Sequence, residues 1–593
     1  MESHWSRLTE FRLSRRKAIT TTGAASAAAI LLAACGSGGS KGGTNANNEA
    51  SLLAKKVDTT NQAVAGGAWQ DLRTEDVVTF DPLTNDSTTS FSEMLMAYSL
   101  LVKHGFALDR AAGAADISGD AADSWEISPD AQQVTFKVRP NHKFDPRSPT
   151  NGRAMNAADV KYSWDKAASL SPYRGNYMNS VNPASPITSV STPDDRTIVF
   201  KLAFPYASFL ELVAHNQHPY IMPVEAEGKF DPRQDMRGSG PFMLTNYVRS
   251  AGFEYQRNPD WYVKGRPFFD SISRPILNDY AAGLAQFETK AVWNFAARQE
   301  DVLRLKRDHP QMVMYQDQPP SGFIATSTVK LSQQPNSPLR DVRVRRAASM
   351  LIDREAALDA LNNLEAFRSQ GLPVTTLWDS HLAAGFPSWI DPRTADLGEG
   401  AKYFKHDVAE AKKLMQAAGF SQAVELPYSW FTLRPAVDKL HTVISSMFVE
   451  SGLFKINAEI LDYNTSWRQV CQASHGDAYF GFCHDQSDGF SEDSFLVALY
   501  TPTGKFAVSN QALPEISDLV VKTRTETDAA RRSSLVKDIQ RRLAVEMPDI
   551  PTPGAVLGYT LRWPWLKNHG VFNTGGASAR PFTEYWYDAA AKS

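Results

Sequence analysis

The sequence predicts a mixed protein of two or more lobes, each of the α/β or the α+β class. Some segments alternate apolar and polar residues with the period of a strand, whereas others repeat apolar residues with the period of a helix, and the two kinds intermix along the chain. The chain has 593 residues. The roughly 550 residues that would follow an export signal exceed what one hydrophobic core usually supports.

Two segments have the alternation typical of half-buried strands. Residues 133–138 read Gln-Val-Thr-Phe-Lys-Val, and residues 197–202 read Thr-Ile-Val-Phe-Lys-Leu. In each segment every second side chain is apolar and would point to one face of a sheet. We therefore expect a strand at each position.

Three segments are expected to be helices. Asn156, Asp407 and Asp528 stand where a side-chain oxygen would cap a first turn. Apolar residues follow each of them at helical spacing, which predicts one buried face per helix. Gly419 is expected to end the second helix and Pro548 the third.

The first 35 residues predict an export signal. Arg15 and Arg16 precede an uncharged run over residues 18–34, which ends Leu-Ala-Ala-Cys at Cys35. The ending resembles a bacterial lipobox, whose cysteine carries lipid, and the paired arginines resemble a twin-arginine signal. The run is about 17 residues long, short of the ~20 that span a bilayer, so we do not interpret it as a transmembrane anchor. Twin-arginine and general export both stay open.

Residues 36–67 are rich in Gly, Ser, Asn and Ala. This composition predicts a flexible tether, roughly 30 Å from end to end as a random coil, with the folded body beginning near Ala68. We expect an extracytoplasmic protein, in the periplasm or on the cell surface, held to the membrane by lipid at Cys35.

The composition argues against nucleic acid as a partner. The chain has 62 Lys and Arg against 65 Asp and Glu, for a net charge of −3. The first 34 residues carry more basic than acidic side chains, so the exported part is more acidic still. A surface for nucleic acid would need an excess of positive charge.

No catalytic or cofactor-binding motif stands out. The sequence has no His-Glu-x-x-His, no P-loop, no Gly-x-Ser-x-Gly and no dinucleotide fingerprint. His215 and His218 have a spacing that a metal site can use, but no cysteine or carboxylate cluster accompanies them, and we interpret them as structural. We expect no enzyme activity, no cofactor and no metal. An exported hydrolase stays open as an alternative, because distant residues can form an active site without a local motif.

Several segments resemble, in the right order over about residues 70–560, the family 5 extracytoplasmic solute-binding proteins of peptide and nickel ABC importers. The longest is Ala-Asp-Ser-Trp-Glu-Ile-Ser-Pro-Asp at 122–130, continued by residues 134–140 and 143–144. The other matching segments are 80–82, 156–164, 238–242, 257–262, 338–347, 352–355, 409–419 and 548–551.

The resemblance implies a two-lobed periplasmic-binding-protein fold with a hinge, whose first lobe is built from both chain ends. The expected division is export signal 1–35, tether 36–67, lobe 1 at 68–326 with an inserted subdomain, lobe 2 at 327–546, and a return to lobe 1 at 547–593.

The resemblance also implies the function. We expect a monomer that captures short peptides and delivers them to the permease subunits of an ABC importer. A nickel chelate, an oligosaccharide or an opine stays open as the solute.

Asp485 is the first candidate ligand-binding residue. Residues 478–483 are expected to form a buried strand and residues 484–489 a loop. In peptide-binding members of the family, an aspartate in the matching loop pairs with the peptide's α-amino group, and Asp485 takes that position. The alternative is a solvated or helix-capping aspartate. The family's usual Asp-Pro after this loop is replaced by Gly-Phe-Ser at 489–491.

Trp430 and Arg434 are further candidates, because they follow a strand-like segment at 424–428 whose end usually faces the cleft in this family. Trp430 would stack on the solute and Arg434 would bind a carboxylate in bidentate fashion. The alternative is a core tryptophan and a surface arginine.

Cys471 and Cys483 are the other two cysteines of the chain. An oxidising compartment would permit a disulfide between them. One pair of cysteines in a large chain does not, however, have the pattern of a small disulfide-rich scaffold. We expect two buried free thiols.

Overall fold

The structure is a computed structural model that describes residues 52–592 except 86, 110–115, 320–323, 432–434, 473–478, 503, 505 and 509–512. The described residues belong to one compact unit. Arg15, Arg16, Cys35 and Arg434 lie outside the described residues. No helix in the described part of the chain is long and apolar enough to cross a membrane.

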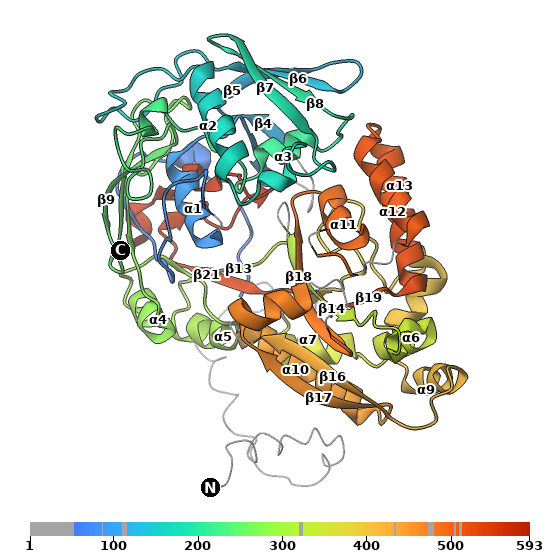
Figure 1. Cartoon of the computed structure of the whole chain (residues 1–593). Coiled ribbons are helices and arrows are strands. Elements are labelled where there is room, and N and C mark those ends of the chain that lie inside the picture. Colours follow the sequence, from blue (N-terminus) through green and yellow to red (C-terminus); the bar gives the residue numbers. More distant parts are fainter. Residues whose placement is uncertain are drawn as a thin grey trace, which may run out of the picture. The chain divides into compact units, whose positions relative to one another are not determined.

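A four-stranded antiparallel sheet forms the subdomain near the top of Figure 1. Its strands, in spatial order, are β5 (Ala122–Ile127), β6 (Gln133–Val138), β8 (Thr197–Leu202) and β7 (Ile187–Asp194). Helix α2 (Ala157–Leu170) packs on this sheet, and the Trp164 ring meets Phe200 at 4.9 Å between centroids. The short helix α3 (Phe209–Ala214) follows.

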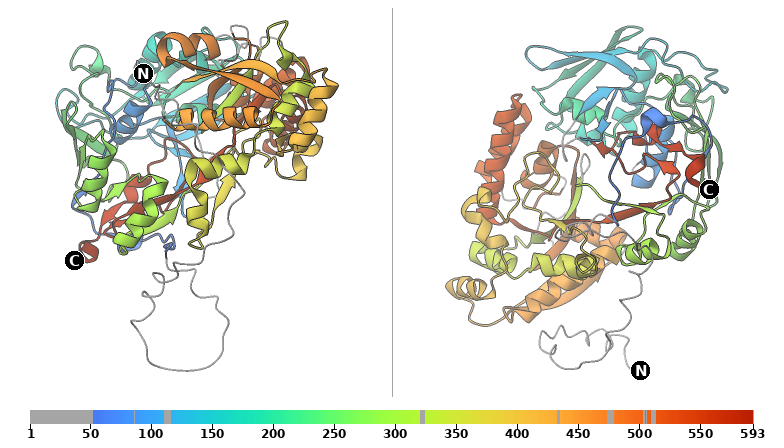
Figure 2. Two further views of the ribbon diagram at one scale, coloured as in Figure 1. Left: turned by 90° about the horizontal axis from the view of Figure 1, so that it is seen from below. Right: turned by 180° about the vertical axis from the view of Figure 1, so that it is seen from behind.

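Two further sheets of three or four strands belong to lobe 1, which we define as residues 68–316 and 559–587. One has the order β1 (Ala68–Gln70), β11 (Ser271–Pro275), β10 (Gly252–Arg257) and β9 (Phe242–Val248). The other has the order β12 (Asn294–Phe295), β21 (Tyr559–Arg562) and β13 (Val313–Gln316). Because β21 lies between two strands from residues 294–316, segments from both chain ends build this lobe; Figure 2 shows the red segment among green and blue ones.

Lobe 2, defined as residues 324–551, is built around a five-stranded mixed sheet. Its order is β17 (Phe454–Leu461), β16 (Val424–Phe431), β18 (Phe482–Gly489), β14 (Ile324–Leu331) and β19 (Asp549–Pro551). Strands β17, β16 and β18 run parallel, whereas β14 is antiparallel to β18 and β19. This sheet has a hydrophobic core of its own, separate from that of lobe 1.

The chain crosses between the lobes in two neighbouring places. One crossing joins β13 to β14, and the other joins β19 to β21 by way of β20 (Ala555–Leu557). The strands at both ends are paired, β13 with β21 and β14 with β19, so the two crossings begin and end side by side. The predicted boundaries at 326/327 and 546/547 fall inside β14 and at the end of α13. We propose that this pair of crossings is the hinge.

The remaining elements connect or cover the sheets. The helices are α1 (Thr88–Ala97), α4 (Tyr280–Glu288), α5 (Gln299–Asp308), α6 (Val342–Met350), α7 (Arg354–Asn362), α8 (Leu364–Arg368), α9 (Val408–Ala417), α10 (Pro435–Glu450), α11 (Glu492–Tyr500), α12 (Pro514–Thr525) and α13 (Ala529–Glu546). The short or irregular helices are η2 (Thr60–Gln62), η3 (Arg174–Asn176), η4 (Val224–Ala226), η5 (Pro338–Arg340), η6 (Ala395–Phe404), η7 (Tyr463–Gln472), η8 (Pro581–Glu584) and η9 (Ala589–Lys592). The short strands are β2 (Val102–His104), β3 (Phe106–Ala107), β4 (Ile117–Gly119), β15 (Thr375–Leu377), β22 (Leu566–Lys567), β23 (Asn573–Thr574) and β24 (Trp586–Tyr587).

Residues 52–67, which the sequence analysis assigned to the tether, lie against lobe 1. The Ala54 amide donates to the Met314 carbonyl at 2.9 Å, and the Thr59 amide donates to Asn568 Oδ1 at 3.0 Å. Trp586 Nε1 donates to Thr59 Oγ1 at 3.0 Å. The described part of the expected tether is therefore part of the folded body.

Candidate functional site

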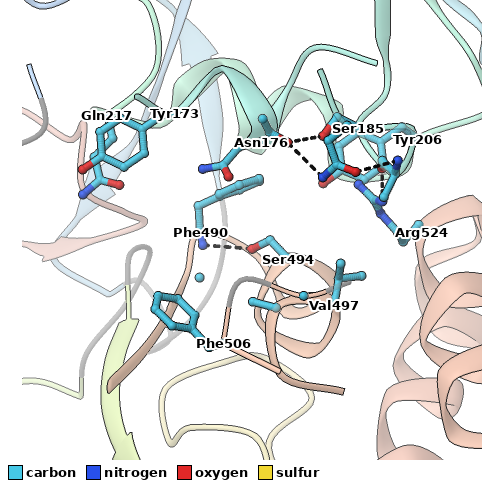
Figure 3. A pocket seen from close by; sticks show the side chains of 16 residues that line it. Tyr173, Asn176, Ser185, Tyr206, Gln217, Phe490, Ser494, Val497, Phe506 and Arg524 are labelled. Atoms are coloured by element: carbon cyan, nitrogen blue, oxygen red, sulfur yellow. Dashed lines mark hydrogen bonds between the residues drawn. The ribbon is translucent and has the colours of Figure 1, made fainter. Parts of the chain in front are cut away.

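A cavity of about 110 Å³, here called the cleft pocket, has walls from both lobes. Lobe 1 contributes Tyr173, Asn176, Tyr206 and Gln217, and lobe 2 contributes Phe490, Ser494, Phe506 and Arg524. Figure 3 shows Tyr173 and Gln217 at one side of the pocket and Tyr206 and Arg524 at the other.

Local structure fixes the lobe 2 wall. Ser491 caps α11, and its side chain accepts from the Ser494 amide at 3.3 Å. Ser494 Oγ in turn accepts from the Phe490 amide at 3.0 Å (Figure 3), which holds the residue between β18 and α11. The Phe490 ring then meets the rings of His215 and His218 from lobe 1, at 5.4 and 5.2 Å.

His215 and His218 are buried, and their role here is packing. Burial lowers the pKa of His218 to about 4 and holds the pKa of His215 well below its usual value. Both rings are therefore neutral near pH 7. No cluster of three or more potential metal ligands occurs among the residues that the structure describes.

Direct contacts join the lobes beside the pocket. Ser208 Oγ donates to Asp493 Oδ1 at 2.6 Å, and the Ala207 amide donates to the Arg524 carbonyl at 2.9 Å. The Arg524 guanidinium donates to the Ala184 carbonyl and lies 3.5 Å from Asp493 Oδ2. Residues of α11 and α12 thus hold the lobe 1 subdomain, and the structure has the lobes in contact around the cavity.

A second cavity of about 340 Å³, here called the acidic pocket, shares Phe490 with the cleft pocket as a lining residue. Glu211, Glu492 and Asp493 line it together with Arg532. Burial raises the pKa of Glu211 to about 8; the charges of Asp493 and Glu492 add to the rise, and Arg532 opposes it. Burial also raises the pKa of Glu492.

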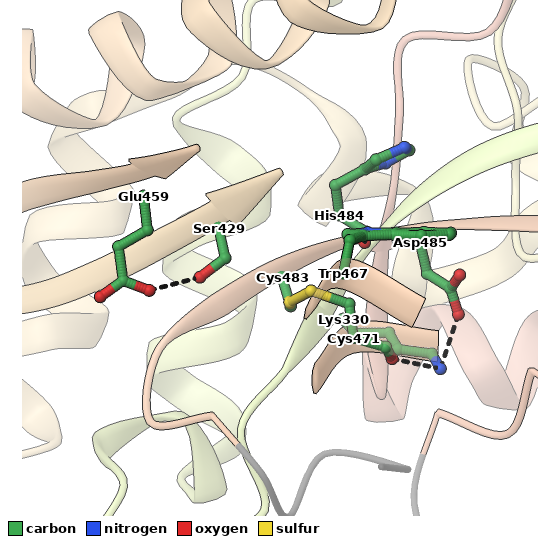
Figure 4. Close-up of a disulfide and its surroundings, with 8 residues drawn as sticks. All are labelled: Lys330, Ser429, Glu459, Trp467, Cys471, Cys483, His484 and Asp485. Carbon is green, nitrogen blue, oxygen red and sulfur yellow. Dashed lines mark hydrogen bonds and ion pairs between the residues drawn. A yellow bond between two sulfur atoms is a disulfide. The ribbon is translucent and has the colours of Figure 1, made fainter. Parts of the chain in front are cut away.

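Asp485 lies inside lobe 2 (Figure 4). Its Oδ2 is 2.6 Å from Lys330 Nζ, and neither side chain has any exposed surface. Lys330 Nζ also donates to the Cys471 carbonyl at 3.2 Å. The carboxylate that the resemblance assigns to a peptide amine is thus already paired with an ammonium from its own lobe.

The predicted loop at 484–489 is wrong. Strand β18 covers Phe482–Gly489 and pairs along its whole length with β14, Asp485 lying opposite Thr328. The polar residues of this stretch suggest a loop when read alone, but the ladder with β14 satisfies the backbone and Lys330 neutralises the acid. Trp467 Nε1 also donates to the His484 carbonyl at 2.7 Å.

Trp430 lies in the core of lobe 2, with 3% of its surface exposed. Its Nε1 donates to Asp438 Oδ1 at 2.9 Å, and its ring meets Tyr428 at 5.2 Å. Asp485 and Trp430 are therefore both engaged within lobe 2, and the structure does not bring either side chain to the cleft pocket. Stacking on a solute stays an untested prediction for Trp430.

The expectation of free thiols is also wrong: Cys471 and Cys483 form a disulfide (Figure 4). The irregular helix η7 ends beside the start of β18, which brings the two Cα atoms to 5.7 Å, a separation that a disulfide spans. The sequence does not show this approach, because it depends on how the segment between them folds back.

Sequence reasoning missed the residues that line the cleft pocket. In the sequence, Phe490 is marked only as part of the Gly-Phe-Ser segment that replaces the family's usual Asp-Pro. Gln217 lies between the two histidines that were considered for metal, and Arg524 lies in a helix without a motif. The pocket joins segments far apart in the chain, so no local spacing marks it.

Residues 116–507 match the family model described as bacterial extracellular solute-binding proteins, family 5 Middle. The di/tripeptide-binding protein 2 of Pseudomonas aeruginosa is 24% identical over 502 residues, covering 81% of this chain and 88% of that protein.

Two solved structures share the fold. NikA from Brucella suis in complex with Fe(III)-EDTA has a TM-score of 0.71 at 18% identity, covering 88% of this chain and all of that one. The periplasmic binding protein DppA from Helicobacter pylori in complex with the peptide STSA has a TM-score of 0.67 at 18% identity, covering 89% and 99%. The predicted two-lobed α/β periplasmic-binding-protein fold is confirmed, and the chain belongs to the family 5 extracellular solute-binding proteins, a family of binding proteins rather than enzymes.

Proposed function

We propose that this protein captures a small solute between its lobes and presents it to the permease of an ABC importer, with short peptides as the first solute to test. The cleft pocket carries the proposal, because its walls come from both lobes and direct contacts join the lobes beside it. Two lobes on a paired crossing are suited to hinge closure around a ligand. The di/tripeptide-binding relative supports a peptide.

We further propose that Cys35 carries lipid and anchors the protein outside the cytoplasmic membrane. The Leu-Ala-Ala-Cys ending and the following Gly- and Ser-rich segment support this. Cys35→Ala should move the protein from the membrane fraction to the aqueous fraction. Unchanged membrane association of this variant would contradict the anchor.

Native mass spectrometry tests the function. Protein purified without denaturation is expected to retain a small solute, and its mass identifies the class. Small-angle scattering is then expected to show a smaller radius of gyration once that solute is added back. A protein that retains nothing, and whose radius no candidate solute changes, would contradict capture by closure. Release of a chemically altered product would favour the hydrolase.

One observation favours a solute without a free α-amine, such as a chelate, an opine or an oligosaccharide: Lys330 already pairs with Asp485. The α-ammonium of a peptide beside this pair would meet a carboxylate whose charge Lys330 already neutralises. Titration calorimetry with a dipeptide and its N-acetyl derivative separates the cases. Similar affinities for the dipeptide and its N-acetyl derivative would agree with an Asp485 carboxylate that is already paired with Lys330. A large loss of affinity on acetylation would instead show that an acidic group of the protein binds the peptide amine.

A further inference from the structure

The cleft pocket offers hydrogen bonds but no free charge. No carboxylate occurs among its described lining residues, and Arg524 is its cation. That guanidinium is already engaged, since it donates to the Ala184 carbonyl, lies 3.5 Å from Asp493 and sits over the Tyr206 ring at 4.9 Å. A charged group entering the pocket would lose water without gaining a counter-charge, which is unfavourable.

Two amides in the pocket wall have spare hydrogen-bonding capacity. Gln217 is only 8% exposed, yet its side-chain amide has no hydrogen-bond partner among the described residues. The side-chain amide of Asn176, an exposed residue that also lines the cavity, has no hydrogen-bond partner in the described part of the chain either. A primary amide presents two N–H donors and a carbonyl acceptor. A group that carries both donors and acceptors satisfies such a pair.

Aromatic rings supply the apolar walls. Tyr173, Phe490 and Phe506 line the pocket. Phe490 is held in place by Ser494 and by the neutral histidine rings of lobe 1. Flat apolar walls with a few placed amides suit a compact group that is apolar on its faces and polar at its edge.

We propose that the cleft pocket binds an uncharged part of the solute that has both hydrogen-bond donors and acceptors, such as a carboxamide or adjacent sugar hydroxyls. Gln217 is its principal hydrogen-bonding residue. This inference rests on the proposed function and names the chemistry of the solute.

Titration calorimetry with matched probes tests the inference. The tripeptides Ala-Gln-Ala, Ala-Glu-Ala and Ala-Lys-Ala share length and differ in the charge of the central side chain, and cellobiose supplies hydroxyls without peptide. We expect Ala-Gln-Ala to bind at least tenfold more tightly than either charged tripeptide. If cellobiose binds and the tripeptides do not, sugar hydroxyls are the groups that supply the hydrogen-bond donors and acceptors. The assignment of a peptide as the solute then fails.

Variants of Gln217 sharpen the test. Gln217→Glu places a carboxylate in the pocket and should shift the preference at least tenfold from Ala-Gln-Ala toward Ala-Lys-Ala. Gln217→Leu should weaken the uncharged probe by about tenfold, since it removes the hydrogen bonds while keeping the size. Gln286→Glu makes the same charge change on an exposed face of α4 outside the pocket and should leave every affinity unchanged. Thermal unfolding checks that all variants fold.

Equal affinities for the three tripeptides, or tighter binding of a charged one, would overturn the inference. The same holds if Gln217→Glu changes no preference, or if no uncharged probe binds. Native mass spectrometry keeps this result apart from the function: a charged solute released from the wild-type protein would overturn the inference and leave capture of a solute standing.

Discussion

Asp485 and Glu211 are both carboxylates withdrawn from bulk water, but their surroundings differ. Asp485 lies in the central sheet of lobe 2 with Lys330 at 2.6 Å, and both are fully buried. Glu211 lines the acidic pocket between the lobes, where burial raises its pKa, the charges of two further carboxylates add to the rise, and Arg532 and the Ser208 side chain oppose it. The first acid has a counter-charge within its own lobe, whereas the second faces a cavity.

The difference lies in the counter-charge: Asp485 has one at 2.6 Å inside its own lobe, whereas Glu211 lines a cavity. Resemblance to peptide-binding relatives pointed to Asp485, but position along the chain does not reveal whether an acid is already neutralised. Glu211 had no motif to mark it, and only the approach of α11 to α3 makes it part of a pocket. The predictions below test whether the two carboxylates behave as differently as their surroundings imply.

The largest expected effect follows from removing the partner of Asp485. Lys330→Met keeps a long side chain but leaves a buried carboxylate without its cation, which should lower the free energy of unfolding by about 3–5 kcal/mol. Chemical denaturation at neutral pH measures this loss. A loss below about 1 kcal/mol would show that Asp485 does not depend on the charge of Lys330, contrary to the buried ion pair.

The double variant Lys330→Met/Asp485→Asn is the matched control. It removes both charges, so much of the lost stability should return, and the departure from additivity measures the coupling of the pair. If the two single losses simply add, Lys330 and Asp485 do not stabilise each other.

Local patterns predicted several elements correctly. The two alternating segments are strands β6 and β8 over the predicted residues. Asn156, Asp407 and Asp528 cap α2, α9 and α13, and each side chain accepts a backbone N–H of the first turn. These features depend on neighbours along the chain, so the sequence contains the information needed to find them.

The candidate site could not be predicted in the same way. The strand character of β18 comes from pairing with β14, and the environment of Asp485 comes from Lys330 on that strand. The cleft pocket likewise needs Gln217 from lobe 1 and Phe490 from lobe 2. Contacts between segments distant in sequence decide these features. A family resemblance predicts the fold, but it does not predict which side chains contact one another.

A smaller effect is expected from Glu211, as a dependence of stability on pH. Its pKa of about 8 in the folded protein lies above the ordinary value of 4.5, so between these values the folded state keeps a proton that the unfolded state has lost. Its contribution to stability is fully present below about pH 4.5 and falls as pH rises toward 8, by at most about 1.4 kcal/mol per pH unit.

Glu211→Gln imitates the protonated carboxyl and should remove this slope. Subtracting its unfolding free energies from those of the wild type at pH 5, 6, 7 and 8 isolates Glu211, because other groups that titrate in this range contribute equally to both proteins. A flat difference curve would mean that Glu211 ionises normally and that the acidic pocket is better hydrated or better balanced by Arg532 than its geometry implies. A falling curve would establish that the folded protein keeps Glu211 protonated well above pH 4.5.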